Sequence, residues 1–288
     1  MQTLIKEIRN CLDMSQADLA ERMNLAFATI NRWENGRAVP NRLAQTMLYE
    51  LCKNESVPVY DLILSKIRQT AEGIGLPEGR KLLYHGSKSG ISGKIEPISR
   101  AQCDFGRGFY MGTDAAQALA LICDFDRSLL YAVSVDMSGL GVAEVPVGLE
   151  WALLVAYHRG RMEAVKGSAL YEKCRSLSRG MDLVIGSIAD DRTFYALDSF
   201  FTGAVTDAAL VAALSALNLG KQYVAVTQKG CDAVRIEAGI GLSYLERLFI
   251  RDAAEENRAK GVSLAADICK KYRRRGLFFD EILAKAGE

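Results

Sequence analysis

The sequence has few of the residues that build metal sites and disulfides. Two of its 288 residues are histidine, and its seven cysteines are scattered without a single C-x-x-C pair. Structural zinc sites need closely spaced Cys and His ligands, so the sequence predicts no metal site. An odd, dispersed set of cysteines is typical of reduced thiols, which predicts a cytoplasmic protein.

Long apolar runs are also missing. No stretch approaches the roughly 18 consecutive apolar residues that a membrane-spanning helix needs. The opening residues, MQTLIKEIRN, contain no apolar core of the kind that a secretion signal carries. Lys and Arg total 36 against 35 Asp and Glu, a net charge of +1. We therefore expect neither a membrane span nor export, and the charge balance excludes a highly basic nucleic-acid coat protein.

The chain is long enough for two domains, and its pattern changes at about residue 81. The N-terminal part carries apolar residues at helical spacing, and a stretch rich in helix-breaking residues separates it from a region with mixed strand-like and helix-like segments. We predict an α+β protein with a helical domain over 1–53, a linker over 54–80, a mixed domain over 81–240 and C-terminal helices over 241–288.

Beyond residue 80 the pattern predicts alternating strands and helices. The expected strands are 81–85, 108–112, 129–135, 182–186, 222–227 and 233–236. The expected helices are 114–123, 149–159, 168–178, 191–201 and 206–217, with two further helices at about 242–259 and 263–285.

The N-terminal domain has the local signals of a helix-turn-helix unit. Ser15 is followed three residues later by Asp18, a capping-box pattern at the start of a short helix over 16–23. A turn at 24–26 leads into a second helix over 27–34. Two short helices joined by a tight turn form the geometry that places a helix in a DNA groove.

The stretch SQADLAERMNLAFATINRWENGRAVP resembles the helix-turn-helix family of lambda repressor and Cro. The resemblance implies DNA binding through residues 1–53, with contacts from Gln16, Phe27, Ala28, Asn31, Arg32 and Arg37. Arg32 could pair with a guanine edge, whereas Phe27 and Ala28 could meet a thymine methyl group. Charges in this domain nearly balance, so we expect tight DNA binding to need a homodimer or help from elsewhere. A helical protein-docking module is the alternative.

Two short stretches carry the candidate chemistry of the second domain. LLYHGS places His85 at the end of an expected strand, directly before Gly86 and Ser87. About 25 residues later, GRGFYMGTD places Arg107 between two glycines and Tyr110 in a short apolar run. Glycines allow a flat group to approach the backbone closely. Taken alone, these stretches also suit a satisfied histidine at a strand end and a glycine-rich hairpin with a half-exposed tyrosine.

Together the two stretches resemble the NAD-dependent ADP-ribosyltransferase superfamily, in the branch of diphtheria toxin and poly-ADP-ribose polymerase. That branch takes His, Tyr and Glu from three strands, and the chain is most similar to a bacterial subfamily often joined to helix-turn-helix modules. The stretches WALLVAYHRGR, DLVIGSIADDRTFYALDSFFTG and KQYVAVTQKGCDAVRI extend the resemblance over residues 81–236. It implies a split β-sheet with flanking helices, NAD as the co-substrate and an unknown ADP-ribose acceptor, in a toxin–antitoxin, phage-defence or self-modifying regulatory setting.

The resemblance also assigns roles to individual residues. His85 would hydrogen-bond a hydroxyl of the nicotinamide-side ribose, and the backbone of Gly86 would hold the nicotinamide amide with help from Ser87. Tyr110 would stack on the nicotinamide ring, a contact worth on the order of 1 kcal/mol beyond area burial. Arg107 would meet the pyrophosphate or remain an exposed hairpin side chain.

The third position departs from the family pattern. Where the family carries Glu, GKQYVAVT has Gln222, whose amide can hydrogen-bond the ribose but carries no charge and cannot act as a base. This argues against polymer synthesis and leaves three hypotheses. We favour a mono-ADP-ribosyltransferase over a transcriptional regulator whose degenerate transferase domain senses NAD or ADP-ribose, and over an interaction module with an inactive pocket.

Two acidic side chains could supply the missing charge, and one further histidine is separate from the site. Asp190 and Asp191 follow an expected strand and could compensate for the absent Glu, although capping of the next helix is the simpler interpretation. His158 ends an expected helix among basic residues, and we expect it to be a surface cation at the helix C-terminus.

Overall fold

The N-terminal part of the chain is helical, as predicted. The computed structural model describes residues 1–189, 191–217, 219–272 and 275–287. Five helices come first: α1 (Gln2–Cys11), α2 (Gln16–Arg22), α3 (Phe27–Glu34), α4 (Arg42–Asn54) and α5 (Val59–Glu72). Ser15 and Asp18 form the predicted capping box at the start of α2. Asn24 takes a φ of 52° in the turn before α3, and Ala26 gives α3 no side-chain cap.

The second domain contains a seven-stranded sheet in the order β4-β5-β6-β2-β1-β3-β7. Its strands are β1 (Arg80–Ser87), β2 (Phe109–Gly112), β3 (Leu129–Asp136), β4 (Val142–Val145), β5 (Leu183–Ser187), β6 (Lys221–Ala225) and β7 (Val234–Gly241). Neighbouring strands are antiparallel except for the parallel pair β4 and β5.

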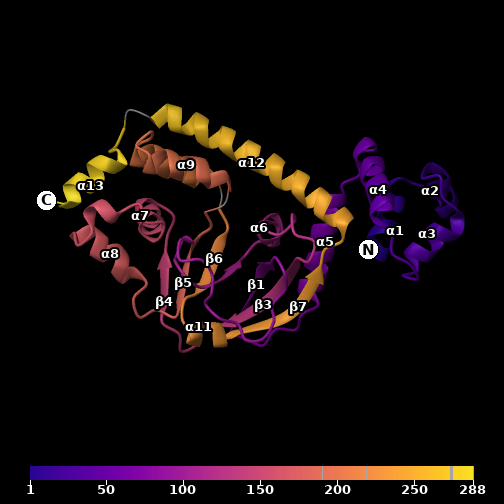
Figure 1. The fold of residues 1–288 in the computed structure, drawn as a ribbon, viewed down its shortest axis with the longest axis horizontal. Coiled ribbons are helices and arrows are strands. Elements are labelled where there is room, and N and C mark those ends of the chain that lie inside the picture. Colours follow the sequence, from indigo (N-terminus) through magenta and orange to yellow (C-terminus); the bar gives the residue numbers. More distant parts are fainter. Residues whose placement is uncertain (190, 218, 273–274, 288) are drawn as a thin grey trace.

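The sheet opens between β1 and β2. β1 pairs with β3 along all eight of its residues, and β2 pairs with β6 along all four. Between β1 and β2, however, the register contains the single pair Tyr84 and Gly112. The split sheet that the sequence predicts is therefore present, with β4, β5, β6 and β2 in one half and β1, β3 and β7 in the other (Figure 1).

Helices flank this sheet. They are α6 (Ala115–Ala120), α7 (Leu149–His158), the 3₁₀ helix η1 (Glu163–Val165), α8 (Ala169–Leu177), α9 (Asp191–Phe201), α10 (Asp207–Ala216), α11 (Gln228–Asp232), α12 (Tyr244–Tyr272) and α13 (Phe279–Gly287). One sheet face, with Val184 and Val224, packs into a core with residues of α7, α9 and α10. The other face, with Met111 and Val133, is covered by loop residues that include Ile91. None of the described helices combines the length and apolar character of a membrane span.

The C-terminal helices differ from the prediction. Two helices are expected over 242–259 and 263–285, but α12 runs without a break from Tyr244 to Tyr272. Its Gly261 is buried, and the helix packs along α9 and α10. Packing against α9 and α10 therefore outweighs the low helix propensity of Gly261, near which the sequence predicts a break. Figure 1 shows α12 crossing the molecule from the N-terminal helices to α13.

Shorter elements also differ from the prediction. β4, η1 and α11 are not predicted, because elements of three to five residues are too short to show a periodic pattern. β7 is predicted to end at 236 but continues to Gly241. Its pairing with β3 supports the glycine-containing end of the strand, where local propensity is weak.

The helix-turn-helix region is joined to the second domain by packing and polar contacts. Tyr49 and Lys53 of α4 each donate a hydrogen bond of 2.7 Å to Asp252 of α12. Helix α5, within the segment expected as a linker, buries Val59 and Ile63 and packs on α12. Helices α2 and α3 lie at the outer end of this assembly, away from the sheet (Figure 1).

Candidate functional site

The predicted DNA-contacting side chains lie on α2, α3 and the loop that follows. Phe27, Ala28, Arg32 and Arg37 are exposed, with Phe27 at 54% of its full exposure. A single exposed phenylalanine is common on protein surfaces, so the exposure of Phe27 leaves it accessible but does not by itself indicate a partner.

Two further predicted contacts are held in a polar network between α2 and α3. Asn31 donates to the side-chain oxygen of Gln16 at 3.1 Å, and Gln16 donates to Glu34 at 2.7 Å. Arg9 completes the network with an ion pair of 2.6 Å to Glu34. Burial raises the pKa of Glu34, but the hydrogen bonds from Arg9 and Gln16 more than offset this, so the pKa is lowered overall. The network fixes the angle between α2 and α3.

His85 lies where the two halves of the sheet separate. Its Nδ1 is 2.7 Å from the carbonyl oxygen of Tyr110, which assigns the ring proton to Nδ1 and leaves Nε2 as an acceptor. The ring stacks on Phe109, with centroids 4.2 Å apart and planes inclined by 23°. Burial lowers the pKa of His85 below its ordinary value, although the Tyr110 carbonyl opposes this. The imidazole is therefore neutral at pH 7.

The side chains of His85 and Tyr110 leave the sheet on opposite faces. Tyr84 lies directly opposite Gly112, so these two share a face, and Tyr110 shares it too because side chains alternate along β2. His85, one residue beyond Tyr84, points to the other face, where it meets Phe109. The structure thus brings the predicted pair together through the backbone of Tyr110 rather than through its ring.

The Tyr110 hydroxyl clamps the loop before β2. It donates to the carbonyl of Gly106 at 2.7 Å and accepts from the amide of Phe105 at 3.1 Å. Burial raises the pKa of the hydroxyl well above its ordinary value. Tyr110 therefore holds the glycine-rich loop in place.

Gln222 lies on the same face as Tyr110, directly opposite Gly112. The side chain is buried, and its Nε2 donates to the backbone carbonyl of Ser187 at 2.9 Å and to Asp104 at 3.2 Å. Asp104 also accepts from Arg159 at 2.7 Å. No sequence pattern singles out Asp104 or Arg159, because an aspartate two residues before a glycine is too common to indicate a site.

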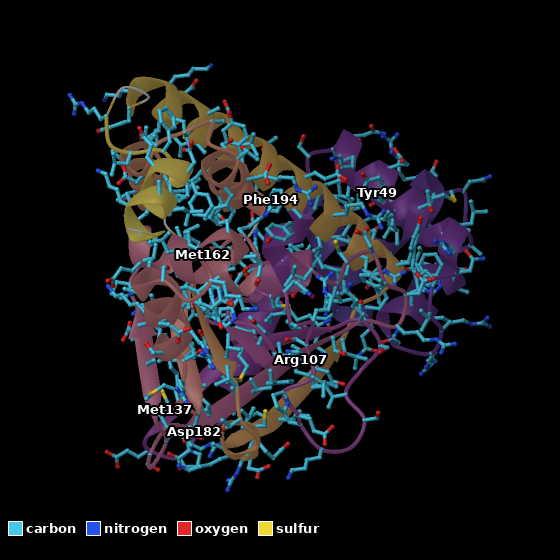
Figure 2. All side chains as sticks on the ribbon, turned by 60° about the vertical axis from the view of Figure 1, so that its left-hand side comes forward. Tyr49, Arg107, Met137, Met162, Asp182 and Phe194 are labelled. Carbon is cyan, nitrogen blue, oxygen red and sulfur yellow. The ribbon has the colours of Figure 1, made fainter. Side chains whose placement is uncertain are left out.

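The remaining predicted site residues have plain structural surroundings. Gly86 packs against α6, where an added Cβ would lie 2.6 Å from the carbonyl oxygen of Ala118. Ser87 ends β1 and is half-buried. Arg107 is exposed on the wall of a cavity of about 420 Å³. Figure 2 shows Arg107 well apart from Phe194 and from the helix-turn-helix region.

His158 differs from the prediction. It is half-buried and lines the same cavity, and its Nε2 is buried without a hydrogen-bond partner among the described residues. Burial lowers its pKa to about 4, with partial opposition from Asp104, so the ring is neutral at pH 7 rather than a surface cation. The reason is that α7 is buried over most of its length and presses its last turn against Gly106.

The candidate acid pair of Asp190 and Asp191 is only partly within the residues that the structure describes. Asp190 lies outside the described residues, and so does the side chain of Asp191. The described part of the chain contains no group of three or more His, Cys, Asp or Glu side chains placed to hold a metal ion.

Comparison with known families agrees with the two-part architecture. Residues 5–53 match the family described as Helix-turn-helix. Residues 82–236, more than half of the chain, match the family described as Protein of unknown function (DUF3990). The chain belongs to the DUF3990 family. Its DUF3990 domain contains His85, Tyr110 and Gln222, and the helix-turn-helix match supports DNA binding by the N-terminal region. No curated protein and no solved structure matches the chain.

Proposed function

We propose that the DUF3990 domain binds NAD where its sheet opens and transfers a single ADP-ribose group to an acceptor, and that the helix-turn-helix domain brings this activity to DNA. The main support is the state of His85. Its Nδ1 is committed to the Tyr110 carbonyl, so Nε2 is an acceptor of fixed direction. A sugar hydroxyl is a donor of the kind that such an acceptor would receive.

The surroundings of the opening are compatible with a sugar joined to an aromatic ring. The Nε2 atom of His85 makes no hydrogen bond to a residue that the structure describes. On the opposite face, an added Cβ at Gly112, beside Gln222, would make an ordinary van der Waals contact with Ile188 at 3.5 Å. Both candidate acceptors, His85 Nε2 and Gln222 Oε1, flank the strand β2.

The reaction itself needs little from the protein beyond binding and orientation. Bound NAD would supply the ADP-ribosyl group: the bond from ribose to nicotinamide breaks, its electron pair leaves with nicotinamide, and the acceptor bonds to the ribose and loses a proton. His85 would orient a ribose hydroxyl on one face of the sheet, and Gln222 would offer its Oε1 acceptor to bound NAD on the other face. Tyr110 would keep the loop before β2 in the conformation that the site needs.

Calorimetric titration of NAD into the full chain, combined with a nicotinamide-release assay, tests this proposal. We expect saturable binding by the wild type and about twofold to tenfold weaker binding by His85→Ala, because a hydrogen bond between neutral groups contributes roughly 0.5–1.5 kcal/mol. His158→Gln, which changes the other histidine, is the control and should bind as the wild type does. A wild-type protein that takes up no NAD would refute the proposal.

A sensor function is the second candidate. Gln222 is uncharged and its Nε2 is already engaged by Asp104 and Ser187, which favours binding over bond cleavage. In that case NAD or ADP-ribose would alter DNA affinity without release of nicotinamide. Saturable NAD binding with no nicotinamide above the buffer rate would support this candidate. Either function suits a toxin–antitoxin or phage-defence system.

A further inference from the structure

The orientation of the Gln222 amide is defined by its partners. An amide nitrogen has two hydrogens to donate, and here one goes to the Ser187 carbonyl and one to the Asp104 carboxylate. Oε1 is consequently the group left to accept a hydrogen bond. It is not among the buried atoms that lack a partner in the described part of the chain.

Asp104 is in a position to act on that amide. Its side chain is 13% exposed, and its two oxygens accept separately from Gln222 and from Arg159. A charge-assisted hydrogen bond is stronger than a neutral one, and more so where solvent is excluded. A carboxylate bound to the N–H side of an amide shifts electron density toward the amide oxygen. Gln222 Oε1 is therefore a better acceptor than the oxygen of an isolated amide.

The loop that carries Asp104 is held against the sheet by its neighbours. The ring of Phe105 lies over Gly186, where an added Cβ would be 2.5 Å from the ring. The Tyr110 hydroxyl bonds both the Phe105 amide and the Gly106 carbonyl. Glycine at 186 thus admits Phe105, and Tyr110 fixes the loop, so that Asp104 meets Gln222.

We infer that Asp104 is a positioning residue that acts through Gln222, so that the Asp104–Gln222 pair replaces the single glutamate expected at this position. This inference rests on the proposed function. In it, Gln222 contacts bound NAD, and Asp104 supplies the negative charge through its hydrogen bond to Gln222. Arg159 and the clamped loop keep the carboxylate in place.

The Asp104–Gln222 pair predicts the effect of placing a glutamate at position 222. A glutamate at position 222 would bring a second carboxylate to within about the present 3.2 Å of Asp104, and like charges at that distance disfavour each other. Gln222→Glu alone should therefore reduce activity instead of restoring it. Exchanging the two groups, with Asp104→Asn and Gln222→Glu together, returns one carboxylate and one amide to the site.

The test measures kcat and KM for NAD in nicotinamide release by the full chain. We expect Asp104→Asn and Gln222→Glu each to lower kcat by about tenfold to a hundredfold, with KM changed by less than about threefold. The exchange variant should recover to within about fivefold of the wild type. Asp252→Asn, a carboxylate with two donors at the helix-turn-helix junction, is the control and should keep kcat. Thermal unfolding of each variant separates loss of activity from loss of fold.

Different results would overturn the role of Asp104 and the proposed transferase function. An active wild type with an unchanged kcat in folded Asp104→Asn, or an exchange variant no better than the single variants, overturns the inference alone. A wild type that neither binds NAD nor releases nicotinamide overturns the proposed function and the inference together.

A measurement on the wild type covers the case in which Asp104→Asn does not fold. The side-chain amide protons of Gln222, identified by their absence in Gln222→Glu, should exchange slowly with solvent and shift when NAD is added. Rapid exchange, or no response to NAD in a protein that binds it, overturns the inference.

Discussion

The Nδ1 atom of His85 lies 2.7 Å from the carbonyl oxygen of Tyr110, across the point where β1 and β2 separate. The hydrogen bond stands where the ladder between the two strands ends, and it links two residues whose side chains lie on opposite faces. The backbone of Tyr110 thus connects the two candidate residues. The Tyr110 ring holds the loop before β2, whereas the His85 ring lies on the other face with Nε2 as an acceptor.

Removing the Tyr110 hydroxyl should destabilise the protein. Tyr110→Phe keeps the ring but leaves the Phe105 amide and the Gly106 carbonyl without the partner that they share. We expect a loss of about 1–3 kcal/mol in the free energy of unfolding, measured by chemical denaturation. Tyr195→Phe, on an exposed ring, is the control and should change stability by less than about 0.5 kcal/mol. Equal stabilities of the two variants would show that the clamp is unimportant.

A side chain at Gly86 should conflict with α6. In Gly86→Ala the new Cβ would lie 2.6 Å from the Ala118 carbonyl oxygen and 2.9 Å from a methyl of Ile122. Such overpacking costs about 1–3 kcal/mol, because backbone on both sides must move. Gly241→Ala, also in a strand but with no neighbour within 4 Å, should be tolerated. A thermal melt of Gly86→Ala that matches Gly241→Ala would contradict the close contact.

The buried ring of His158 should make stability depend on pH. Its pKa falls to about 4 in the folded protein, from an ordinary value near 6.5, so the unfolded chain binds the proton more readily. Stability from the neutral ring is therefore complete above about pH 6.5 and declines as the pH falls toward 4, by on the order of 3 kcal/mol. Denaturation midpoints at a series of pH values measure this decline. His158→Gln should show a smaller decline, and an unchanged decline would assign it to other groups.

DNA binding should depend on the exposed arginine of α3. Arg32→Ala removes a side chain that lies on the predicted groove-facing surface, and we expect about 1–3 kcal/mol weaker binding to DNA fragments selected from a random pool. Arg22→Ala, which removes an exposed ion pair of 2.9 Å with Glu55, is the matched control. Fluorescence anisotropy at fixed salt compares the two variants. If both bind DNA as the wild type does, Arg32 does not contact DNA, and the alternative of a protein-docking module is favoured.

Much of the fold could be predicted because its signals are local. The capping box of Ser15 and Asp18, the left-handed turn at Asn24 and the helical spacing before residue 54 depend on residues a few positions apart, and the structure contains all of them. Most strands and helices of the second domain also follow from periodicity. The split sheet was expected from the resemblance carried by LLYHGS and GRGFYMGTD. The structure confirms it, because β1 and β2 pair at a single position, Tyr84 with Gly112.

The composition and the local patterns of the sequence determined the two-part organisation, the helix-turn-helix unit and the candidate site residues. Tertiary structure alone decided how those residues act. It placed His85 and Tyr110 on opposite faces, buried His158 against Gly106 and brought Asp104 to Gln222 from 118 positions away along the chain. The physical reason is that strand register, the burial of α7 and the clamped loop depend on contacts between distant segments, and no local pattern records such contacts.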